Sequence, residues 1–315
     1  MTLSPTNQTP TTRKPAFSIT PRILGMLEAV ARYGLLTSEQ IARLDGGSRQ
    51  KVTRFLQSLV QLGLLRLVDA APEEFVGSFF DARPRVFAIT TKGLEVLGAA
   101  GIRLNVKPKR SNTLLAHDIA CAETMFKIVS AVAAHGGVRL FDQPELMAMM
   151  PVKTRRLSKP LRLRPTAQPR DYPHLGEILR KPAIIATDPD RLFALVLPDN
   201  TGWSFALELD RGNEDITAQR IKGRATFFRK VLGYNSARLS GLVAKQWGDM
   251  CTSMRVVVVT ISESHIASMI QTQRHVGAPA GLILYSTPER LGRIGPLGPA
   301  WITGKRDGVS LLDRA

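Results

Sequence analysis

The sequence predicts a mixed α/β protein, in which a small helical domain precedes a larger domain built on a mixed β-sheet. Three observations lead to this prediction. Three short helical periods and two strand-like segments follow one another in the first hundred residues. After residue 112, a long apolar helical stripe leads into strands that alternate with further helices. Residues 254–261 (MRVVVVTI) are β-branched on both faces, which is typical of a strand covered by helices on each side.

The N-terminal domain is expected to span residues 18–102, after a disordered tail of residues 1–17. Thr20, followed by proline, begins a first helix. Thr37 begins a second helix and has glutamine three residues later, which forms a capping box. Ser48 caps a third helix whose apolar residues face the core while its other side is basic and polar.

Segments 64–68 and 85–90 are predicted to be the strands of a hairpin, followed by a short fourth helix. Three helices and a hairpin in this order are typical of a winged helix-turn-helix, in which the third helix enters the major groove of DNA. The alternatives are that the third helix has only a solvated charged face, or that the domain binds protein. The candidate DNA contacts are Arg49, Gln50, Lys51, Thr53 and Arg54 on the third helix, and Arg66, Arg83 and Arg85 on the wing.

The length and composition of the chain are those of an ordinary globular protein. Its 315 residues leave room for two domains, and 44% of them are hydrophobic. No run of about 18 apolar residues occurs, and the first 17 residues lack the apolar centre of a signal peptide. Cys121 and Cys251 lie far apart without metal-binding spacing, which indicates free buried thiols. We therefore expect a soluble, cytoplasmic protein that does not contact a membrane.

The charge of the chain indicates a nucleic-acid partner. It carries 43 Lys and Arg against 26 Asp and Glu, a net charge of +17. Residues 151–182 hold nine basic residues against two acidic ones, whereas residues 188–215 hold seven acidic residues against two arginines. The first of these segments also contains six prolines, so we expect an irregular basic insertion there. Either it contacts DNA, through Arg162 and Arg164, or it is a disordered, solubilising insertion.

A basic linker, residues 103–111, is expected to lead into a second domain of residues 112–315. The first helix of this domain carries His117 on the same apolar stripe as Cys121. A histidine in such a position is more often a hydrogen-bonded core residue than a catalytic one, and both roles stay open.

Residues 187–212 (TDPDRLFALVLPDNTGWSFALELDRG) are predicted to be two strands joined by a turn. If Asn200 forms the tip of a simple hairpin, Asp190 falls opposite Asp210, with Glu208 on the diagonal. Side chains alternate along a strand, so the three carboxylates share one face. Because like charges repel, they need a cation, a proton or bound water between them. This arrangement predicts a divalent-metal site formed by Asp190, Glu208 and Asp210.

The order of helix, three strands, helix and strand resembles the core of PD-(D/E)xK nucleases. Pro189-Asp190 and Glu208-Leu209-Asp210 stand where that family's motif would fall. The resemblance implies that the two acids bind Mg²⁺ and that a lysine two residues after the glutamate activates water. Here that position holds Asp210, which cannot stabilise a hydroxide as an ammonium does. Lys222, from the helix expected to begin near Asp215, could supply the missing charge.

A second resemblance covers nearly the whole chain. The residues that carry it are Leu35 to Leu44, His117-Asp118, Pro189-Asp190, Glu208 to Gly212, Lys222 and Tyr234. With these residues the chain is similar to replication-relaxation proteins, which occur on plasmids and other mobile elements of bacteria. This resemblance implies a DNA-binding role in plasmid replication control or maintenance, with double-stranded DNA and replication or mobilisation proteins as partners and a homodimer as an open alternative.

Three hypotheses remain open at this point. The first is a DNA-binding regulator whose nuclease-like domain is a binding platform. The second is a metal-dependent endonuclease that uses Asp190, Glu208, Asp210 and Lys222, with Mg²⁺ as its cofactor and His117 as a further catalytic candidate. The third is an acidic hairpin with a purely structural role. The basic charge favours the first two equally, and the missing lysine favours the first.

Overall fold

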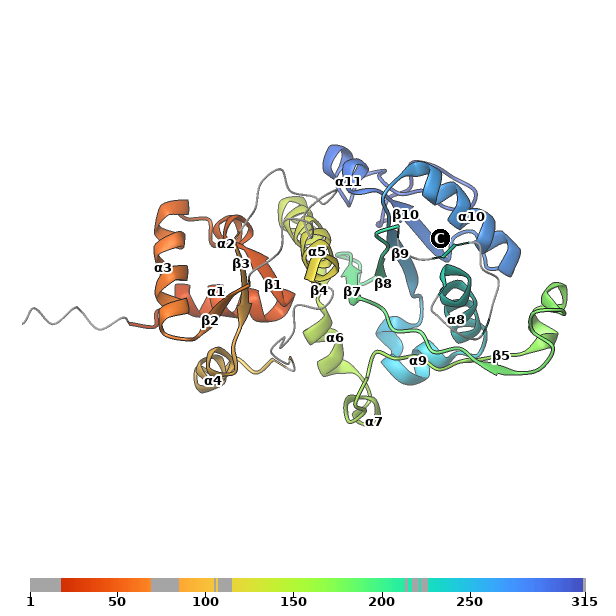
Figure 1. Ribbon diagram of the computed structural model, residues 1–315, viewed down its shortest axis with the longest axis horizontal. Coiled ribbons are helices and arrows are strands. Elements are labelled where there is room, and N and C mark those ends of the chain that lie inside the picture. The colour runs from red at the N-terminus through yellow and green to blue at the C-terminus, as the bar shows by residue number, and fades with distance from the viewer. Residues whose placement is uncertain are drawn as a thin grey trace, which may run out of the picture.

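The computed structural model describes residues 18–68, 85–104, 106, 115–212, 215–216, 221 and 226–313. It is a mixed α/β protein, as predicted, with a helical N-terminal part joined to a larger part that contains a five-stranded sheet (Figure 1). The N-terminal elements are α1 (Pro21–Tyr33), β1 (Leu35–Thr37), α2 (Ser38–Asp45), α3 (Arg49–Gln61), β2 (Leu65–Val68), β3 (Val86–Ile89) and α4 (Thr91–Ala99).

The helix starts in the N-terminal part follow the predicted capping residues, with one exception. The Thr20 hydroxyl accepts a hydrogen bond from the backbone N–H of Ile23, and Pro21 occupies the first turn of α1. Thr37 and Gln40 form the predicted capping box at α2. Ser48 stands at the N-cap of α3, but its side chain makes no capping hydrogen bond.

Strand β1 is an element that sequence patterning missed. It pairs antiparallel with β3, which pairs antiparallel with β2, so the predicted hairpin is part of a three-stranded sheet. Three residues are too few to show a periodicity, which explains why β1 was not expected. The predicted wing residue Arg83 lies outside the described residues, as do the predicted tail and most of the predicted linker.

The C-terminal part is built on a sheet in the order β10-β9-β8-β7-β4. Strands β8, β9 and β10 run parallel, while β7 is antiparallel to both β8 and β4. Its principal helices and sheet strands are α5 (Leu115–His135), β4 (Arg139–Phe141), α6 (Gln143–Met149), β7 (Arg191–Val196), β8 (Gly202–Leu209), α8 (Phe227–Leu239), α9 (Leu242–Trp247), β9 (Arg255–Val259), α10 (Glu263–Val276), β10 (Ile283–Ser286) and α11 (Pro288–Ile294).

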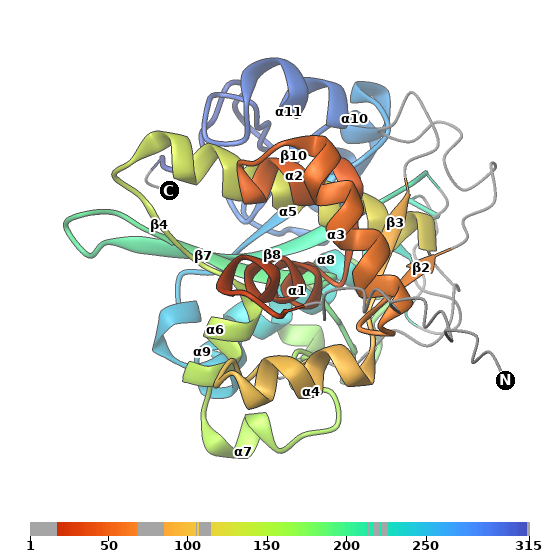
Figure 2. The same cartoon turned by 90° about the vertical axis from the view of Figure 1, so that its left-hand side faces the viewer.

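Helices cover both faces of this sheet, as expected for a strand that is β-branched on both sides. Helices α5 and α11 lie on one side, and α8 and α9 lie on the other (Figure 2). Val257 and Val259 of β9 belong to the core under α5, whereas Val256 and Val258 belong to the core that includes α8 and α10.

The register of the central hairpin differs from the prediction. Arg191 pairs with Leu207, whereas the prediction would place it opposite Leu209, and the Asp190 N–H donates to Leu207 O, so Asp190 does not stand opposite Asp210. The reason is the turn: the Leu197 N–H donates to Thr201 O at 2.7 Å, which closes a loop of three residues centred on Asp199. Asn200 adopts φ 62°, the left-handed conformation that commonly ends such a three-residue loop. The centre of the turn is thus Asp199 instead of Asn200, and each residue of β7 pairs with a residue two positions earlier in β8 than predicted.

The proline-rich segment 151–182 folds against the core with short elements. These are α7 (Val152–Arg155), β5 (Thr166–Ala167), which pairs with β6 (Ala183–Ile184), and two 3₁₀ turns, Pro169–Asp171 and Pro173–Leu175. Tyr172, Leu175 and Leu179 are buried, and the Tyr172 hydroxyl lies 2.8 Å from the hydroxyl of Ser236 on α8. The alternative of a disordered insertion is therefore wrong for this segment.

Helix α8 begins later than predicted. Thr226 caps it and its first residue is Phe227, so the predicted start near Asp215 is wrong. Asp215 instead forms an isolated bridge with Thr226, and Lys222 lies outside the described residues.

The two parts of the chain touch through polar contacts around α1, α2 and α5. Arg32 of α1 is ion-paired with Asp142 at 2.7 Å, and Arg191 donates from Nη2 to the carbonyl of Tyr33 at 2.9 Å. The side-chain amide of Gln40 donates to Glu123 of α5, which is partly exposed. Among the described residues, no helix is long and apolar enough to cross a membrane.

Candidate functional site

Asp190 lies directly before β7 and Glu208 lies near the end of the neighbouring strand β8, but their side chains contact helices on opposite faces of the sheet. Asp190 contacts His117 of α5, whereas Glu208 contacts Lys230 and Tyr234 of α8, so the prediction that these carboxylates share one face is wrong. The Asp190 N–H donates to Leu207 O at 2.9 Å, which holds Asp190 beside the end of β8. Both carboxylates therefore lie at the carboxyl end of β8. In α/β sheets, this edge is where ligands commonly bind.

Asp190 is held by groups from α5 and β8. Its Oδ2 lies 3.1 Å from His117 Nε2 and accepts the backbone N–H of Leu209 at 2.8 Å. Burial by itself would raise the pKa of Asp190, but the hydrogen bond and charge of His117, together with the charge of Lys230, lower it below its ordinary value. Asp190 is therefore ionised at neutral pH.

Glu208 has a different environment, because its side chain faces α8 and is only 3% exposed. The hydroxyl of Tyr234 donates to Oε1, and the Lys230 ammonium lies 2.8 Å from Oε2. Burial and the charge of Asp190 raise the pKa of Glu208 to about 7, against the opposing effects of Lys230 and Tyr234. Near neutral pH, Glu208 thus exchanges a proton while Asp190 stays charged, which is a pattern common at functional sites.

Asp210 lies two residues further on and is bound by its own partners. Its Oδ2 accepts from the Thr260 hydroxyl at 2.8 Å and lies 3.0 Å from His265 Nε2, while its Oδ1 accepts from the Gly212 N–H at 3.0 Å. These contacts tie the end of β8 to the end of β9 and the start of α10. The position that holds lysine in the nuclease motif is thus part of a hydrogen-bonded corner.

Lys230 is the residue that sequence reasoning missed. It supplies the positive charge beside Glu208 that was predicted to come from Lys222. Lys230 and Tyr234 are four residues apart, so they lie on one face of α8, and both reach the same carboxylate. A lysine and a tyrosine at this spacing, on a helix that packs against an acidic strand end, is the signal that could have identified them.

His117 also contacts a buried thiol. Its Nδ1 lies 3.7 Å from Cys121 Sγ, on the opposite side of the ring from Asp190. His117, Cys121 and Asp190 have ligand atoms within 4.8 Å of one another. The carboxylate of Asp190 contacts Nε2 of His117 and the thiol of Cys121 contacts Nδ1, so we interpret the three residues as a hydrogen-bonded chain. Burial raises the pKa of Cys121 well above its ordinary value, so the thiol stays protonated.

The donor chemistry of Asp190 and Glu208 fits a magnesium ion, which prefers carboxylate oxygens. The described hydrogen bonds to Asp190 all fall on Oδ2, and its Oδ1 has no partner among the described residues. Both oxygens of Glu208 already have protein partners, and an ion would share this carboxylate with Lys230. Asp210 would approach such an ion only by giving up the Thr260 and His265 contacts.

The predicted DNA-contact residues of α3 lie together on its solvent side. Val52, Leu56 and Leu59 are buried in the N-terminal core, which turns the basic face outward at the end of the molecule farthest from the sheet (Figure 1). The exposed members are Arg49, Gln50, Lys51 and Arg54, with Thr53 partly exposed, and on the hairpin Arg85 is exposed and Arg66 partly exposed.

In the proline-rich segment, Arg162 and Arg164 differ. Arg162 donates from Nε to Asp188 at 2.8 Å, so its positive charge is paired with a carboxylate of the same chain. Arg164 is exposed. The structure therefore brings Arg162 beside the acidic strand end and directs Arg164 to solvent.

Comparison with known protein families adds a separate observation. The sequence matches the replication-relaxation family over residues 27–248. The chain belongs to the replication-relaxation family. The match runs from α1 to the end of α9, so it covers α3, His117, Asp190, Glu208 and Lys230 in one span. The family name links the chain to replication. No curated protein and no solved structure matches the sequence.

Proposed function

We propose that this replication-relaxation protein binds double-stranded DNA and acts in the replication or maintenance of a plasmid or another mobile element. The observation that carries the proposal is the solvent-facing basic side of α3. It presents Arg49, Lys51 and Arg54 at the outer end of a chain whose net charge is +17.

In this proposal, residues 18–102 form a winged helix-turn-helix. Helix α3 enters the major groove with its N-terminal half, where Arg49, Gln50 and Arg54 have the chemistry to contact base edges and phosphates. Arg49 is ion-paired with Glu39 at 3.2 Å, but its side chain is 71% exposed, so exchanging Glu39 for a phosphate costs little. Arg85 on the hairpin supports the wing contact.

The test is a gel-shift titration of duplex DNA with the full chain and with an Arg49→Ala, Arg54→Ala variant. Losing two phosphate contacts should weaken binding and reduce the slope of log affinity against log salt by about 2. A matched control is Lys245→Ala with Arg293→Ala, which removes the same charge from exposed positions on α9 and α11. Equal losses in both variants would show that net charge, and not α3, governs binding.

A second function, a metal-dependent DNA endonuclease, is favoured by one specific observation. Asp190 and Glu208 lie at the same end of the paired strands β7 and β8, and Lys230 lies 2.8 Å from Glu208. Bound Mg²⁺ would act as a Lewis acid on a phosphate and lower the pKa of a water molecule. Asp190 and Glu208 would hold the ion, Lys230 would orient a water molecule or a phosphate oxygen, and His117 would keep Asp190 in place.

The test of this second function is incubation of supercoiled plasmid with the protein, with and without Mg²⁺ or Mn²⁺. Metal-dependent nicking that disappears in an Asp190→Ala, Glu208→Ala variant would establish the nuclease. DNA binding without nicking, equal in both proteins, would leave the first proposal alone.

A further inference from the structure

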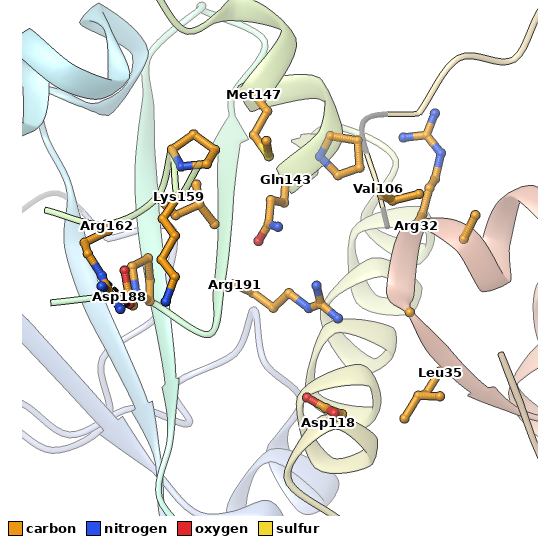
Figure 3. Close-up of a pocket in the computed structure, with 16 residues that line it drawn as sticks. Arg32, Leu35, Val106, Asp118, Gln143, Met147, Lys159, Arg162, Asp188 and Arg191 are labelled. Atoms are coloured by element: carbon orange, nitrogen blue, oxygen red, sulfur yellow. Dashed lines mark hydrogen bonds and ion pairs between the residues drawn. The ribbon is translucent and has the colours of Figure 1, made fainter. Parts of the chain in front are cut away.

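A cavity of about 510 Å³ lies where the end of α1 meets the C-terminal part of the chain (Figure 3). Its apolar wall includes Pro144 and Met147 of α6 and Leu161 of the proline-rich segment. Its volume is that of a site for a small organic ligand, for which roughly 300–1,000 Å³ is typical.

Four cationic side chains and two carboxylates line this cavity. Two of the cations are already neutralised, because Arg32 is paired with Glu28 and Asp142, and Arg162 is paired with Asp188. The other two are Lys159 and Arg191.

Lys159 and Arg191 make no ion pair with any residue that the structure describes. Lys159 is exposed, and the described side-chain contact of Arg191 is its bond to the neutral carbonyl of Tyr33. In Figure 3, Lys159 extends toward Asp188 on one side of the cavity, Arg191 points the other way, toward α5, and Gln143 lies above Arg191. Four cations against two carboxylates, Asp118 and Asp188, give the described lining an excess of positive charge, which suits an anion.

The cavity adjoins the candidate site. Its lining includes Pro189 and Arg191, which flank Asp190 in sequence, and Asp118, which follows His117. Asp190, His117 and Glu208 are not among its lining residues, so the cavity is a neighbour of the candidate site and not part of it.

We propose that this cavity binds a nucleoside phosphate. Lys159 and Arg191 supply positive charge to the phosphate from two sides of the cavity, and the apolar wall of Pro144, Met147 and Leu161 takes the face of the base. The side-chain oxygen of Gln143 accepts from the Leu192 N–H at 3.2 Å, so its NH₂ group offers a donor to the edge of the base. The nucleoside phosphate is either a free nucleotide or one unit of a DNA strand. The second source rests on the proposed DNA-binding function.

The experiment is calorimetric titration of the full chain with thymidine 5′-monophosphate and, separately, with thymidine. The monophosphate should bind and thymidine should bind far more weakly, since thymidine lacks the charged group. A Lys159→Gln, Arg191→Gln variant should weaken monophosphate binding about a hundredfold, or about tenfold for each charge-assisted contact. A Lys245→Gln, Arg293→Gln control should bind as the wild type does. Absence of monophosphate binding, or equal binding by the variant and the wild type, would overturn the proposal.

Three further measurements separate this inference from the proposed function. If Arg191→Gln lowers the melting temperature, the single variant Lys159→Gln tests monophosphate binding in its place. Lys159 is exposed and has no described ion pair, so its replacement should leave the stability of the fold unchanged. Displacement of a labelled single strand by the monophosphate would support the strand as the source, and binding without displacement would support a free nucleotide. The Arg49→Ala, Arg54→Ala variant should lose duplex affinity and keep monophosphate affinity, so failure of either proposal leaves the other intact.

Discussion

The Lys230 ammonium of α8 lies 2.8 Å from Oε2 of Glu208, which belongs to the central strand β8. The contact places a positive charge beside the second acid of the site, although that charge does not come from the position two residues after the acid. Glu208 is nevertheless difficult to ionise, because burial raises its pKa to about 7. The charge of Lys230 and the burial of Glu208 therefore act in opposite directions on the pKa of this carboxyl.

The protein should become less stable as the pH rises, because the buried Glu208 carboxyl then loses its proton. Its folded pKa of about 7 is above the ordinary value of 4.5, so the folded state binds more protons between these two pH values. This stabilisation is complete below pH 4.5 and is lost as the pH rises through 7, with a total on the order of 3 kcal/mol. Chemical denaturation of the wild type and Glu208→Gln from pH 5 to 8 measures it. The variant should show a flatter dependence, and parallel curves would contradict the prediction.

Replacing Lys230 by methionine should destabilise the protein most at high pH, where Glu208 is ionised and would lack its cation. We expect a loss of about 3 kcal/mol at pH 8, at the low end for a broken buried pair because Lys230 is 21% exposed. The double variant Lys230→Met, Glu208→Gln should recover most of this loss. A double-mutant cycle at pH 8 gives the coupling energy, and a value near zero would show that the pair does not interact.

Replacing His117 by alanine should raise the pKa of Asp190. His117 is the largest of the influences that keep this carboxyl ionised despite burial, through its hydrogen bond and its charge. A carboxyl ¹³C NMR titration that compares the wild type with His117→Ala measures the change, and Asp190→Asn identifies the resonance. An unchanged pKa of Asp190 would remove His117 from the site.

Asp210 should prove to be structural, whereas Asp190 should be the acid that matters for any metal-dependent chemistry. Asp210→Asn weakens the contacts to Thr260 and His265 and should cost about 1–3 kcal/mol of stability while leaving metal-dependent nicking in place. Asp190→Asn should abolish nicking. Thermal melts and plasmid nicking of the two variants side by side decide this, and loss of nicking in a folded Asp210→Asn protein would restore Asp210 as a ligand.

Helix α1 contains Gly25 and ends at Gly34, and of these two glycines only Gly34 should not tolerate replacement by alanine. It has φ 80°, and an added Cβ would lie 3.0 Å from Nη2 of Arg191. Gly34→Ala should therefore cost about 1–2 kcal/mol, because it combines backbone strain with a displaced arginine. Gly25→Ala is the matched control: a Cβ added there would meet no neighbouring atom within 4 Å, and it should stabilise the helix by up to about 1 kcal/mol. Melting temperatures of both variants test this contrast.

Local sequence signals predicted most of the architecture but only part of the site. Capping residues such as Thr37 and turn formers such as Gly34 act over a few residues, so the helices of the N-terminal part could be placed from sequence. The hairpin register could not, because it depends on Asn200 adopting a left-handed conformation, which places Arg191 opposite Leu207. Lys230 was missed because its approach to Glu208 depends on how α8 lies across the sheet.

The acidic residues of the site also hold the fold together, which affects how relatives of this protein should be compared. Asp190 joins α5 to the strand end through His117 and the Leu209 N–H, and Glu208 joins the same strand to α8 through Tyr234 and Lys230. A descendant that lost its chemistry would still need these side chains to keep two helical layers attached to one strand. Retention of the motif across a lineage is therefore expected for active and inactive members alike, and activity must be measured protein by protein.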